Sequence, residues 1–416
     1  MSSEWAELPL GDVVSFKTGK LDSNAAEESG QFPFFTCSPI TLAINSYAFD
    51  TEAVILAGNN ANGVFSTKHY SGKFNAYQRT YVIEPIDRET TSCRYVYFVI
   101  CHMVGHLKEL SIGSATKFLT KKILNALPVR IPSKAEQDGI ALLLSALDDR
   151  ITLLRETNAS LEAIAQALFK SWFVDFDPVR AKLEGRAPEG MDEDTAALFP
   201  DGFEESELGL MPRGWRVGTL ADLSHLNPES WTVKNHPESL VYVDLANAKD
   251  NEIAAVTNFD FDEAPSRARR VLRDGDTIVG TVRPGNRSFA FIHEPASNLT
   301  ASTGFAVLRP SEVENTEFVY LAATQDSSIE HLAHVADGGA YPAVRPDVVS
   351  GLQIVVPDAQ VLKSFHAVAA SLLAKVSENQ KQAQTLATLR DTLLPRLISG
   401  QLRLPEMVAE LLESNV

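Results

Sequence analysis

This chain contains the same unit twice: an alternating apolar strand, a proline and a long helix. Residues 127–151 read LPVRIPSKAEQDGIALLLSALDDRI, and residues 352–376 read LQIVVPDAQVLKSFHAVAASLLAKV. The two stretches align without a gap at one constant offset, which places Pro132 against Pro357. An internal repeat of this size predicts a chain built from two related halves, each a mixed α/β globule followed by one long helix.

The repeat extends beyond this unit. The glycine loop GSATKFLT stands against GGAYPAVR, and YVIEP stands against AVLRP, at the same offset. Near the start of each half, Trp5 with LPLGDVVSF matches Trp215 with VGTLADLSH at a slightly smaller offset. We therefore expect equivalent strands and loops in the two globules.

Both long helices carry a heptad seam, which is typical of helices that pair along their length. The first seam runs through Ile140, Leu144, Leu147, Ile151, Leu154, Asn158, Leu161, Ala165, Leu168 and Trp172. The second runs through Phe365, Ala369, Leu372, Val376, Asn379, Ala383, Leu386, Arg390, Leu393 and Leu397. Arg390 interrupts the second seam, and we expect Leu389 beside it to compensate.

Each seam holds one asparagine, Asn158 in the first and Asn379 in the second. If the helices pair antiparallel about their midpoints, the two asparagines meet, and a buried polar pair of this kind fixes helix register. We therefore predict an intramolecular antiparallel coiled coil whose register is set by Asn158 and Asn379. The alternative is that both side chains lie at the edge of the seam, in water.

These patterns divide the chain into six parts. They are a first globule at 1–133, a long helix at 134–173, an acidic linker at 174–213, a second globule at 214–357, a second long helix at 358–402 and a tail at 403–416. The linker is rich in Pro and Gly and has an aromatic start at Trp172, Phe173 and Phe176. These three side chains are expected either to pack on a globule or to form a docking patch for another protein.

The net charge of −17 argues against nucleic acid as a partner if it is taken alone. The charge is unevenly distributed, however: residues 184–207 hold nine acidic side chains and one basic side chain, whereas residues 111–134 hold five basic side chains and no acidic one. Local charge decides whether a surface can meet a phosphate backbone. The absence of a long apolar run and the use of only three cysteines favour a cytoplasmic protein without a membrane segment.

The sequence holds no recognisable catalytic motif. Gly58 and Gly63 have the spacing of a phosphate-binding loop, but no Lys follows them, and a G-x-S-x-G motif is absent. The adenine-methyltransferase tetrad of the Asn-Pro-Pro-aromatic type is also missing. Cys101 and His106 are five residues apart, which fits one helix face poorly, so no metal site is expected there. A chain without catalysis or bound cofactor of its own is therefore expected.

Polar, glycine-rich loops occupy matching places in the two halves. Asn and Gln side chains can read adenine edges, while Lys and Arg bind phosphates or guanine, and turn formation is the alternative role for such residues. The candidates in the first half are Asn59, Asn60, Asn62, Lys68, Lys73, Asn75, Tyr77, Gln78, Arg79, Ser114, Thr116, Lys117 and Lys121. Those in the second half are Arg267, Arg269, Arg283, Asn286, Arg287, Ser302, Thr303, Tyr341 and Arg345.

Taken together, these features resemble the DNA-specificity subunit of type I restriction-modification systems. The resemblance is carried by the LPLGDVVSFKTGK start, the SATKFLTKKILNALPVRIPSKAEQDGIALLLSALDDRI unit, the LFKSWFVDFDPVRAKLEGR exit, the MPRGW restart and the LRDTLLPRLISGQLRL end. It implies an α+β fold in which two α/β target-recognition globules are separated by two long antiparallel helices with pseudo-two-fold internal symmetry.

The resemblance also implies partners. A chain of this family reads a split double-stranded DNA target and docks two methyltransferase subunits together with restriction/translocase subunits. S-adenosylmethionine, ATP and Mg would then belong to those partner subunits. Two other classes of protein stay open: a scaffold that binds only protein, and an enzyme, either nuclease or methyltransferase, with an unrecognised site.

Overall fold

The structure, a computed structural model, describes residues 5–60, 63, 65–113 and 116–404. The described parts of residues 1–152 and 383–416 form one compact unit, and residues 153–382 form a second. Two helices of equal length contribute to both units: α4 (Lys134–Phe173) and α10 (Ala359–Ile398).

The first unit is built on a mixed six-stranded sheet. Its strand order is β2 (Val14–Thr18), β8 (Thr80–Pro85), β5 (Phe49–Ala57), β7 (Thr67–Ala76), β3 (Phe32–Phe35) and β4 (Leu42–Ile44). All neighbours pair antiparallel except β3 and β7, which are parallel. Two small ribbons accompany the sheet: β1 (Ala6–Pro9) with β10 (Pro128–Ile131), and β6 (Asn59–Asn60) with β9 (Lys117–Phe118).

Helix α2 (Cys93–Leu110) packs on this sheet against β5 and β7. Its buried face includes Tyr95, Phe98 and Val99, and together with Leu144 of α4 these side chains form one apolar cluster. The helix begins at Ser92, whose hydroxyl accepts a hydrogen bond from the Tyr95 backbone N–H at 3.4 Å. The remaining short elements of the unit are α1 (Leu10–Val13), a 3-10 turn at Ser23–Ala25 and α3 (Lys121–Asn125).

The second unit holds two four-stranded sheets. One has the order β14 (Ser224–Leu226), β23 (Phe305–Pro310), β20 (Thr277–Gly280) and β21 (Phe289–Phe291). The other has the order β18 (Thr257–Asp260), β15 (Ser239–Val243), β22 (Leu299–Ser302) and β19 (Ala268–Val271). Smaller ribbons pair β13 (Arg216–Thr219) with β24 (Gln353–Val356) and β16 (Ala248–Lys249) with β17 (Glu252–Ile253).

Helices cover one side of this unit's apolar core. They are α7 (Thr316–Thr324), α8 (Asp326–Val335) and α9 (Pro346–Ser350). Every residue of α7 is buried, and Phe318 of this helix packs edge-on against Phe169 of α4, with ring centroids 5.2 Å apart. Phe365 of α10 joins the same aromatic cluster. The long helices are therefore part of the core of the second unit.

The stretch expected to be an acidic linker is folded onto the second unit. It contains α5 (Asp177–Leu183), α6 (Glu193–Leu198) and a hairpin of β11 (Phe203–Ser206) with β12 (Gly209–Pro212). Trp172, Phe173 and Phe176 are 7%, 4% and 7% exposed and lie in the main core cluster of the unit. This corrects the docking-patch interpretation, because rings enclosed by the chain's own side chains are not available to a partner.

The internal repeat is present at the level of strand register. In the first unit Ala6 pairs with Ile131, and in the second Arg216 pairs with Val356, which are the equivalent positions of the sequence repeat. Helices α3 and α9 begin and end at equivalent positions, and so do α4 and α10. The two halves of the sequence thus share this strand pairing and these helix boundaries, although their central sheets differ.

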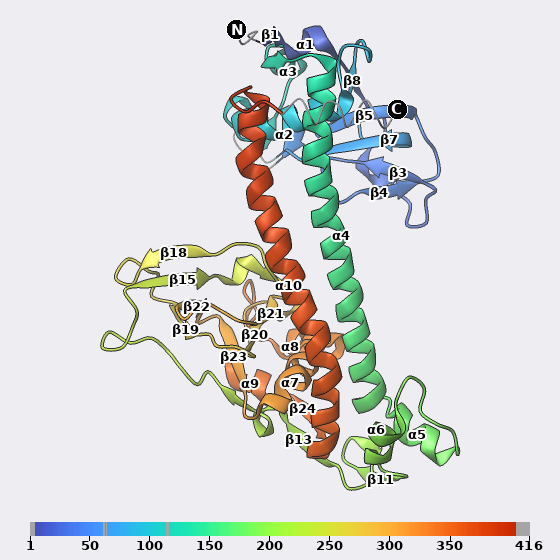
Figure 1. The fold of residues 1–416 in the computed structure, drawn as a ribbon, viewed down its shortest axis with the longest axis vertical. Helices are drawn as coiled ribbons and strands as arrows, with labels where there is room; N and C mark the ends of the chain where they lie inside the picture. Colours follow the sequence, from blue (N-terminus) through green and yellow to red (C-terminus); the bar gives the residue numbers. More distant parts are fainter. Residues whose placement is uncertain (1–4, 61–62, 64, 114–115, 405–416) are drawn as a thin grey trace. The chain divides into compact units, whose positions relative to one another are not determined.

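Helices α4 and α10 pack antiparallel within each unit (Figure 1). In the second unit Asn379 donates a hydrogen bond from Nδ2 to Oδ1 of Asn158 at 2.9 Å, and both side chains are buried. In the first unit Arg390 Nη1 lies 2.7 Å from Asp148 Oδ1. The predicted fold class, an α+β chain with two mixed globules and two long antiparallel helices derived from an internal repeat, is confirmed.

Candidate nucleic-acid interface

Three chain segments meet at one edge of the first unit. Strand β5 ends at Ala57, and the chain then passes through Gly58 into β6, which pairs with β9 of the glycine loop. In this ribbon Asn59 lies opposite Phe118 and Asn60 opposite Lys117. The loop is closed at its base by two backbone hydrogen bonds between Ile112 and Phe118, at 3.1 and 2.8 Å. The asparagine-rich segment and the lysine-bearing loop therefore form one surface.

Glycine is required at two positions of this surface. A Cβ atom on Gly58 would lie 2.4 Å from the carbonyl oxygen of Arg79, and a Cβ on Gly113 would lie 2.1 Å from that of Thr116. Gly113 also has a φ of +107°, which favours glycine. The segment that carries Arg79 therefore packs closely against the segment at Gly58. The Arg79 guanidinium also lies 5.7 Å from the centre of the Phe118 ring in the glycine loop.

The second unit contains the same arrangement. Asp337 and Ala343 exchange two backbone hydrogen bonds at 3.0 and 2.8 Å, and in the sequence repeat these positions are equivalent to Ile112 and Phe118. Val282 bridges to Ala343, as Asn59 does to Phe118. The repeat thus builds a glycine loop joined to a second polar loop twice, although the sequences of the two second loops differ.

In the second unit, Arg283 contacts the glycine loop through both its backbone and its side chain. Its backbone N–H donates to the Pro342 carbonyl at 2.7 Å, its guanidinium donates to the Ala340 carbonyl at 2.7 Å, and it lies 4.6 Å from the centre of the Tyr341 ring. The residue adopts a left-handed φ of 49°, a conformation with a cost for a non-glycine residue. Tyr341 is 71% exposed, so this cation–π pair presents a charged and aromatic surface to solvent.

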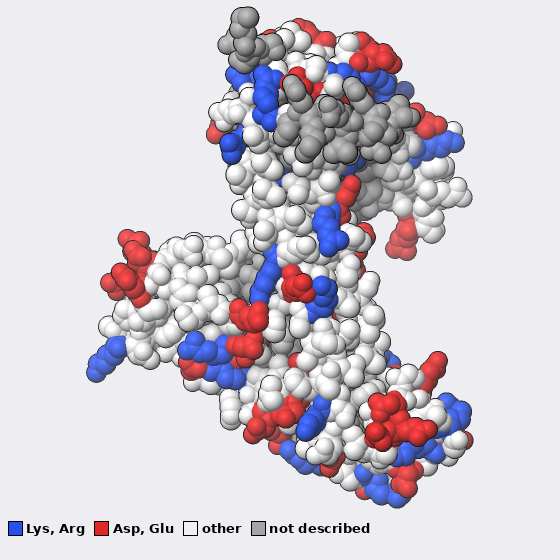
Figure 2. Space-filling view, viewed as in Figure 1, with Lys and Arg blue, Asp and Glu red and all other residues white. Residues whose placement is uncertain are grey.

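Four basic side chains of these loops keep their charge available. Within the described ranges, no carboxylate forms an ion pair with Arg79, Lys117, Lys121 or Arg283. Lys121 donates to a backbone carbonyl, that of Phe16, at 3.4 Å. Elsewhere on the face seen in Figure 2, basic and acidic side chains alternate and form no continuous basic field. The loops of both units therefore carry positive charge that no carboxylate among the described residues neutralises.

Two of the candidates that the sequence predicted are buried and therefore do not lie on this surface. Asn75 is 5% exposed and donates from its amide to the Ser46 carbonyl at 3.3 Å. Ser302 is 3% exposed, and its hydroxyl accepts the Gly304 backbone N–H at 3.2 Å. Their polar atoms serve turns of the chain itself, so the expectation that they contact a ligand is corrected.

Four basic candidates are exposed or half-buried and bind other groups of the chain. Arg267 donates to Tyr242 Oη at 2.9 Å and pairs with Asp244, while Arg287 pairs with both Asp250 and Asp326. Arg269 donates to the Ala268 carbonyl at 2.7 Å and lies over the Phe261 ring. Lys68 donates to Thr41 Oγ1 at 2.9 Å, and partial burial lowers its pKa. The basic cluster around Arg267 is therefore largely compensated by its own neighbours.

Most of the other candidates lie in loops or at the ends of strands and helices, whereas Lys73 lies within β7. Those that are half-buried are Asn59, Asn60, Tyr77, Thr116 and Lys117, and those that are exposed are Lys73, Gln78, Arg79, Lys121, Arg283, Asn286, Thr303, Tyr341 and Arg345. Asn62 and Ser114 lie outside the described residues. The structure thus brings Asn59, Arg79 and Lys117 together in the first unit, and Arg283 with Tyr341 in the second.

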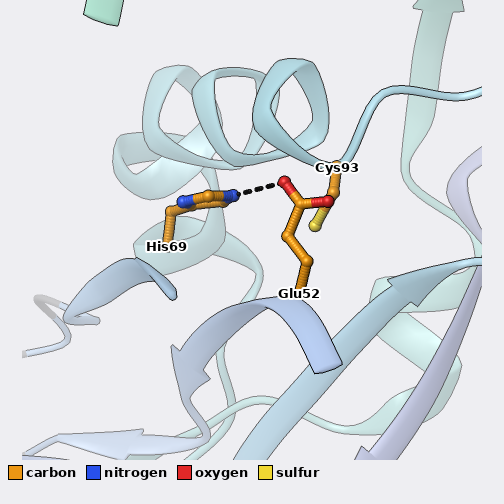
Figure 3. A group of neighbouring side chains, drawn as sticks. All are labelled: Glu52, His69 and Cys93. Carbon is orange, nitrogen blue, oxygen red and sulfur yellow. Dashed lines mark hydrogen bonds and ion pairs between the residues drawn. The ribbon is translucent and has the colours of Figure 1, made fainter. Parts of the chain in front are cut away.

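A separate polar cluster lies between the sheet and α2 of the first unit. Glu52, His69 and Cys93 each offer one possible metal-ligand atom, and these atoms lie within 4.8 Å of one another (Figure 3). His69 lies on β7 and Glu52 on β5, where the register places His69 opposite Val54, two residues from Glu52 on the same face. The pattern is invisible in the sequence, because it depends on strand register.

The hydrogen bonds of this cluster favour a structural network over a metal site. His69 Nε2 lies 2.8 Å from Glu52 Oε1, and the Arg94 guanidinium lies 3.2 Å from His69 Nδ1. Arg88 contacts the other Glu52 oxygen at 3.1 Å. Burial raises the pKa of Cys93 to about 12, so the thiol stays protonated. Two guanidinium groups and a protonated thiol form an environment that opposes a dication.

A pocket of about 540 Å³ adjoins this network in the first unit. Its rim carries Lys134 with Asp138, which form an ion pair, and Arg94, which lies 3.8 Å from Asp149. Positive and negative groups therefore balance across the pocket, and its lining selects neither an anion nor a cation.

Comparison with known proteins agrees with this architecture. Residues 2–163 match the family described as "Type I restriction modification DNA specificity domain". The EcoDI specificity subunit of Escherichia coli is 44% identical over 165 residues, which is 40% of this chain and 35% of that protein. The HindI specificity subunit of Haemophilus influenzae is 26% identical over 330 residues, which is 68% of this chain and 71% of that protein.

A solved structure shares the fold along nearly the whole chain. The type I restriction-modification S subunit from M. genitalium superposes with a TM-score of 0.59 at 16% identity, covering 95% of this chain and 96% of that one. At this identity the likeness shows the fold alone.

Each unit thus holds a glycine loop joined to a second polar loop, and helices α4 and α10 contribute to both units. Residues 2–163 are thus similar to the DNA-specificity domain of type I restriction-modification systems, and the chain is similar to specificity subunits of such systems. The relatives are named specificity subunits, which agrees with the prediction that the chain is not itself an enzyme. In the described part of the chain, no helix is both long enough and apolar enough to cross a membrane.

Proposed function

We propose that this chain is the sequence-specific DNA-binding subunit of a type I restriction-modification complex in the cytoplasm. Its recognition domains, residues 1–133 and 214–357, each read one part of a split, asymmetric double-stranded target. The observation that carries the proposal is the loop arrangement built twice at equivalent positions. Among the described residues, Arg79, Lys117 and Lys121 in one copy and Arg283 in the other have no carboxylate partner.

Positive charge at these loops suits phosphate contacts, and exposed amides and guanidinium groups suit base edges. An aromatic ring under Arg283 restricts the guanidinium to one plane, which favours bidentate contacts over a diffuse charge interaction. Because the net charge of the chain is −17, non-specific attraction to DNA by the molecule as a whole is weak, and binding depends on these local surfaces.

The proposal includes partners for the helices. Ile164 on α4 and Leu389 on α10 are 49% and 45% exposed and occupy equivalent positions of the repeat. Exposed large apolar side chains on helices are typical of surfaces that another chain covers. Two equivalent positions fit two copies of one methyltransferase subunit. Restriction/translocase subunits complete the complex, and S-adenosylmethionine, ATP and Mg are used by these partners.

The test is charge reversal in the first recognition domain. Lys117, Lys121 and Lys122 are changed to Glu, and binding of the assembled complex to target duplex is measured across a salt series. We expect weaker binding, and a slope of log K against log salt that falls by about 0.9 for each phosphate that the complex no longer neutralises. Arg150→Glu on α4 is the control with the same sign of charge change.

A scaffold that does not bind DNA predicts no change in affinity or salt slope, and this result overturns the proposal. An enzyme predicts methylation or cleavage by the purified chain alone. A map of methylated adenine in cells with and without the chain then gives the split motif. An unchanged map in the presence of the methyltransferase partner also contradicts the proposal.

A further inference from the structure

One of the two residues at the tip of a hairpin in the second unit is buried, which is unusual for a turn. Strands β16 and β17 are joined by Asp250 and Asn251, both with positive φ, at 45° and 63°. This is the backbone of a two-residue hairpin turn, for which Asn is a favoured residue. Such tips normally project into solvent, yet Asn251 is only 4% exposed.

Burial is explained by the partners of Asn251, which come from three different elements. Its side-chain Nδ2 donates to Glu162 Oε1 of α4 at 2.7 Å, and its backbone carbonyl accepts Gln380 Nε2 of α10 at 2.6 Å. Its side-chain Oδ1 accepts the backbone N–H of Phe291 in β21 at 2.8 Å. One residue therefore connects both long helices to the sheet of the recognition domain.

This polar connection and an apolar cluster are two of the attachments between the domain and the helices. In the apolar cluster Phe318 of α7 packs on Phe169 of α4, and Phe169 packs on Phe365 of α10. Glu162 lies seven residues before Phe169 on α4, about 10 Å along the helix at ~1.5 Å per residue. Apolar contacts are non-directional, whereas hydrogen bonds fix orientation, so the two attachments together prevent the domain from pivoting on its apolar contact.

Neighbouring ion pairs add little to this restraint. Arg155 on α4 and Glu252 lie 3.2 Å apart, with side chains 62% and 53% exposed. Exposed pairs of this kind contribute little and are screened by salt. Other polar contacts each join one helix to α7: His366 of α10 contacts Glu317 at 2.5 Å, and Gln166 of α4 contacts Thr324 at 3.5 Å. The bonds of Asn251 differ from these because they reach α4, α10 and β21 from one buried residue.

We propose that Asn251 is a positioning residue that fixes the second recognition domain on the helix pair and thereby sets the spacer length accepted between the two parts of the DNA target. The inference rests on the proposed function. One base pair of added spacer displaces a half-site by ~3.4 Å and rotates it by roughly 35°, because B-DNA turns once in about 10–10.5 base pairs. A domain that Asn251 connects to both helices is restrained against this change, whereas a domain without the Asn251 amide has more freedom to follow it.

The test uses the complete chain in cells together with its methyltransferase partner. Asn251→Gly keeps a residue that tolerates the positive φ and removes the amide. The matched control is Asn227→Gly: Asn227 also has a positive φ, 48°, and its Oδ1 accepts the Val307 N–H at 3.0 Å within the domain. Glu162→Gln is the conservative variant, since its amide oxygen can still accept from Asn251.

The readout is the map of methylated adenine, resolved into the two half-site sequences and the spacer between them. We expect Asn251→Gly to keep both half-sites but to methylate targets with the spacer one base pair longer or shorter, with discrimination between spacers reduced by about tenfold. Asn227→Gly and Glu162→Gln are expected to keep the single wild-type spacer. A merely structural role lowers stability without changing the spacer.

The inference is overturned if Asn251→Gly retains the wild-type spacer alone, or if it changes a half-site sequence while the spacer stays fixed. Should Asn251→Gly abolish folding, Gln380→Ala removes one of the two helix contacts, and an unchanged spacer preference in that variant also overturns the inference. The proposed function fails separately, if the wild-type chain directs no split motif at all.

Discussion

Asn379 on α10 donates its side-chain amide to the side-chain oxygen of Asn158 on α4 at 2.9 Å, and Asn158 donates in turn to the Val376 carbonyl at 3.1 Å. Both residues are buried within the apolar seam. A register shift of the helices would leave these amides without partners, at a cost of about 1–3 kcal/mol for each buried group. The pair therefore disfavours alternative pairings more than it adds to total stability.

The first prediction concerns this pair. Asn158→Leu alone leaves the Asn379 amide unpaired, so the free energy of unfolding should fall by about 1–3 kcal/mol. The double variant Asn158→Leu, Asn379→Leu should recover most of that loss but lose its preference for one register. Denaturant unfolding of the four proteins of this cycle measures the coupling. Additive effects of the two substitutions would show that the pair does not act as a unit.

The second prediction concerns Arg390, which interrupts the seam. The expectation that Leu389 fills its place is wrong, because Leu389 is 45% exposed and the Arg390 guanidinium stays between the helices, paired with Asp148. Asp148→Ala should destabilise the first unit by more than Arg390→Leu, because the half-buried Arg390 then keeps only the exposed Asp391 as its partner, whereas Arg390→Leu places an apolar side chain in the seam. Urea unfolding of both variants checks the order, and equal losses would contradict it.

The helix pair and its register could be predicted from the sequence, because heptad spacing and two asparagines in equivalent seams allow one antiparallel alignment. The equivalence of the two ribbons, Ala6 with Ile131 and Arg216 with Val356, agrees with the expectation of equivalent strands in the two halves, whereas the pairing partners of these strands were not predicted. Because the same sequence pattern occurs twice, a structure predicted from one copy can be checked against the other copy.

The folded state of residues 174–213 could not be predicted in this way. Its apolar residues, such as Phe199 and Phe203, are separated by acidic and Pro/Gly-rich stretches, and they become a core only when Trp172 and Trp215 pack on them. The burial of Asn75 and Ser302 could not be predicted either. Asn and Ser side chains bind bases, but they also form hydrogen bonds within turns, and the sequence does not distinguish the two roles. The Asn251 contacts depend on tertiary placement and leave no periodic signal.

The third prediction concerns pH. Burial lowers the pKa of His69 below its ordinary value of 6.5; the hydrogen bond that the imidazole donates to Glu52 opposes this shift, and the charge of Arg94 adds to it. The folded protein thus binds the imidazole proton more weakly than the unfolded chain, so the stability from neutral His69 is present above pH 6.5 and is lost as the pH falls toward the lowered pKa. His69→Gln should flatten the fall in unfolding free energy between about pH 7 and 5. Equal pH slopes in the two proteins would argue against the assignment.

The fourth prediction uses the three cysteines as reporters. Burial raises the pKa of Cys93 to about 12 and that of Cys101 to about 11, so both should react slowly with alkylating reagents at pH 8. Cys37 lies beside the candidate surface, its thiol 3.4 Å from the Arg79 carbonyl. Alkylation followed by mass spectrometry should therefore label Cys37 first, and target duplex should protect it in the assembled complex. Protection by an unrelated duplex to the same extent would show that the effect is not sequence-specific.

The fifth prediction separates the two recognition surfaces. Arg79 and Arg283 occupy comparable loops, each over an aromatic ring, but in different domains. If each domain reads one half-site, Arg283→Ala should relax the sequence requirement of one half and leave the other intact, at a cost of about 1–3 kcal/mol for the missing base interaction. Arg79→Ala should do the reverse. A uniform loss of affinity over all targets, with the salt slope reduced by about 1, would instead assign the side chain to a phosphate. Methylation maps for the two variants, compared with Arg150→Ala on α4 as a control, distinguish these outcomes, because only a base-reading side chain changes one half of the motif.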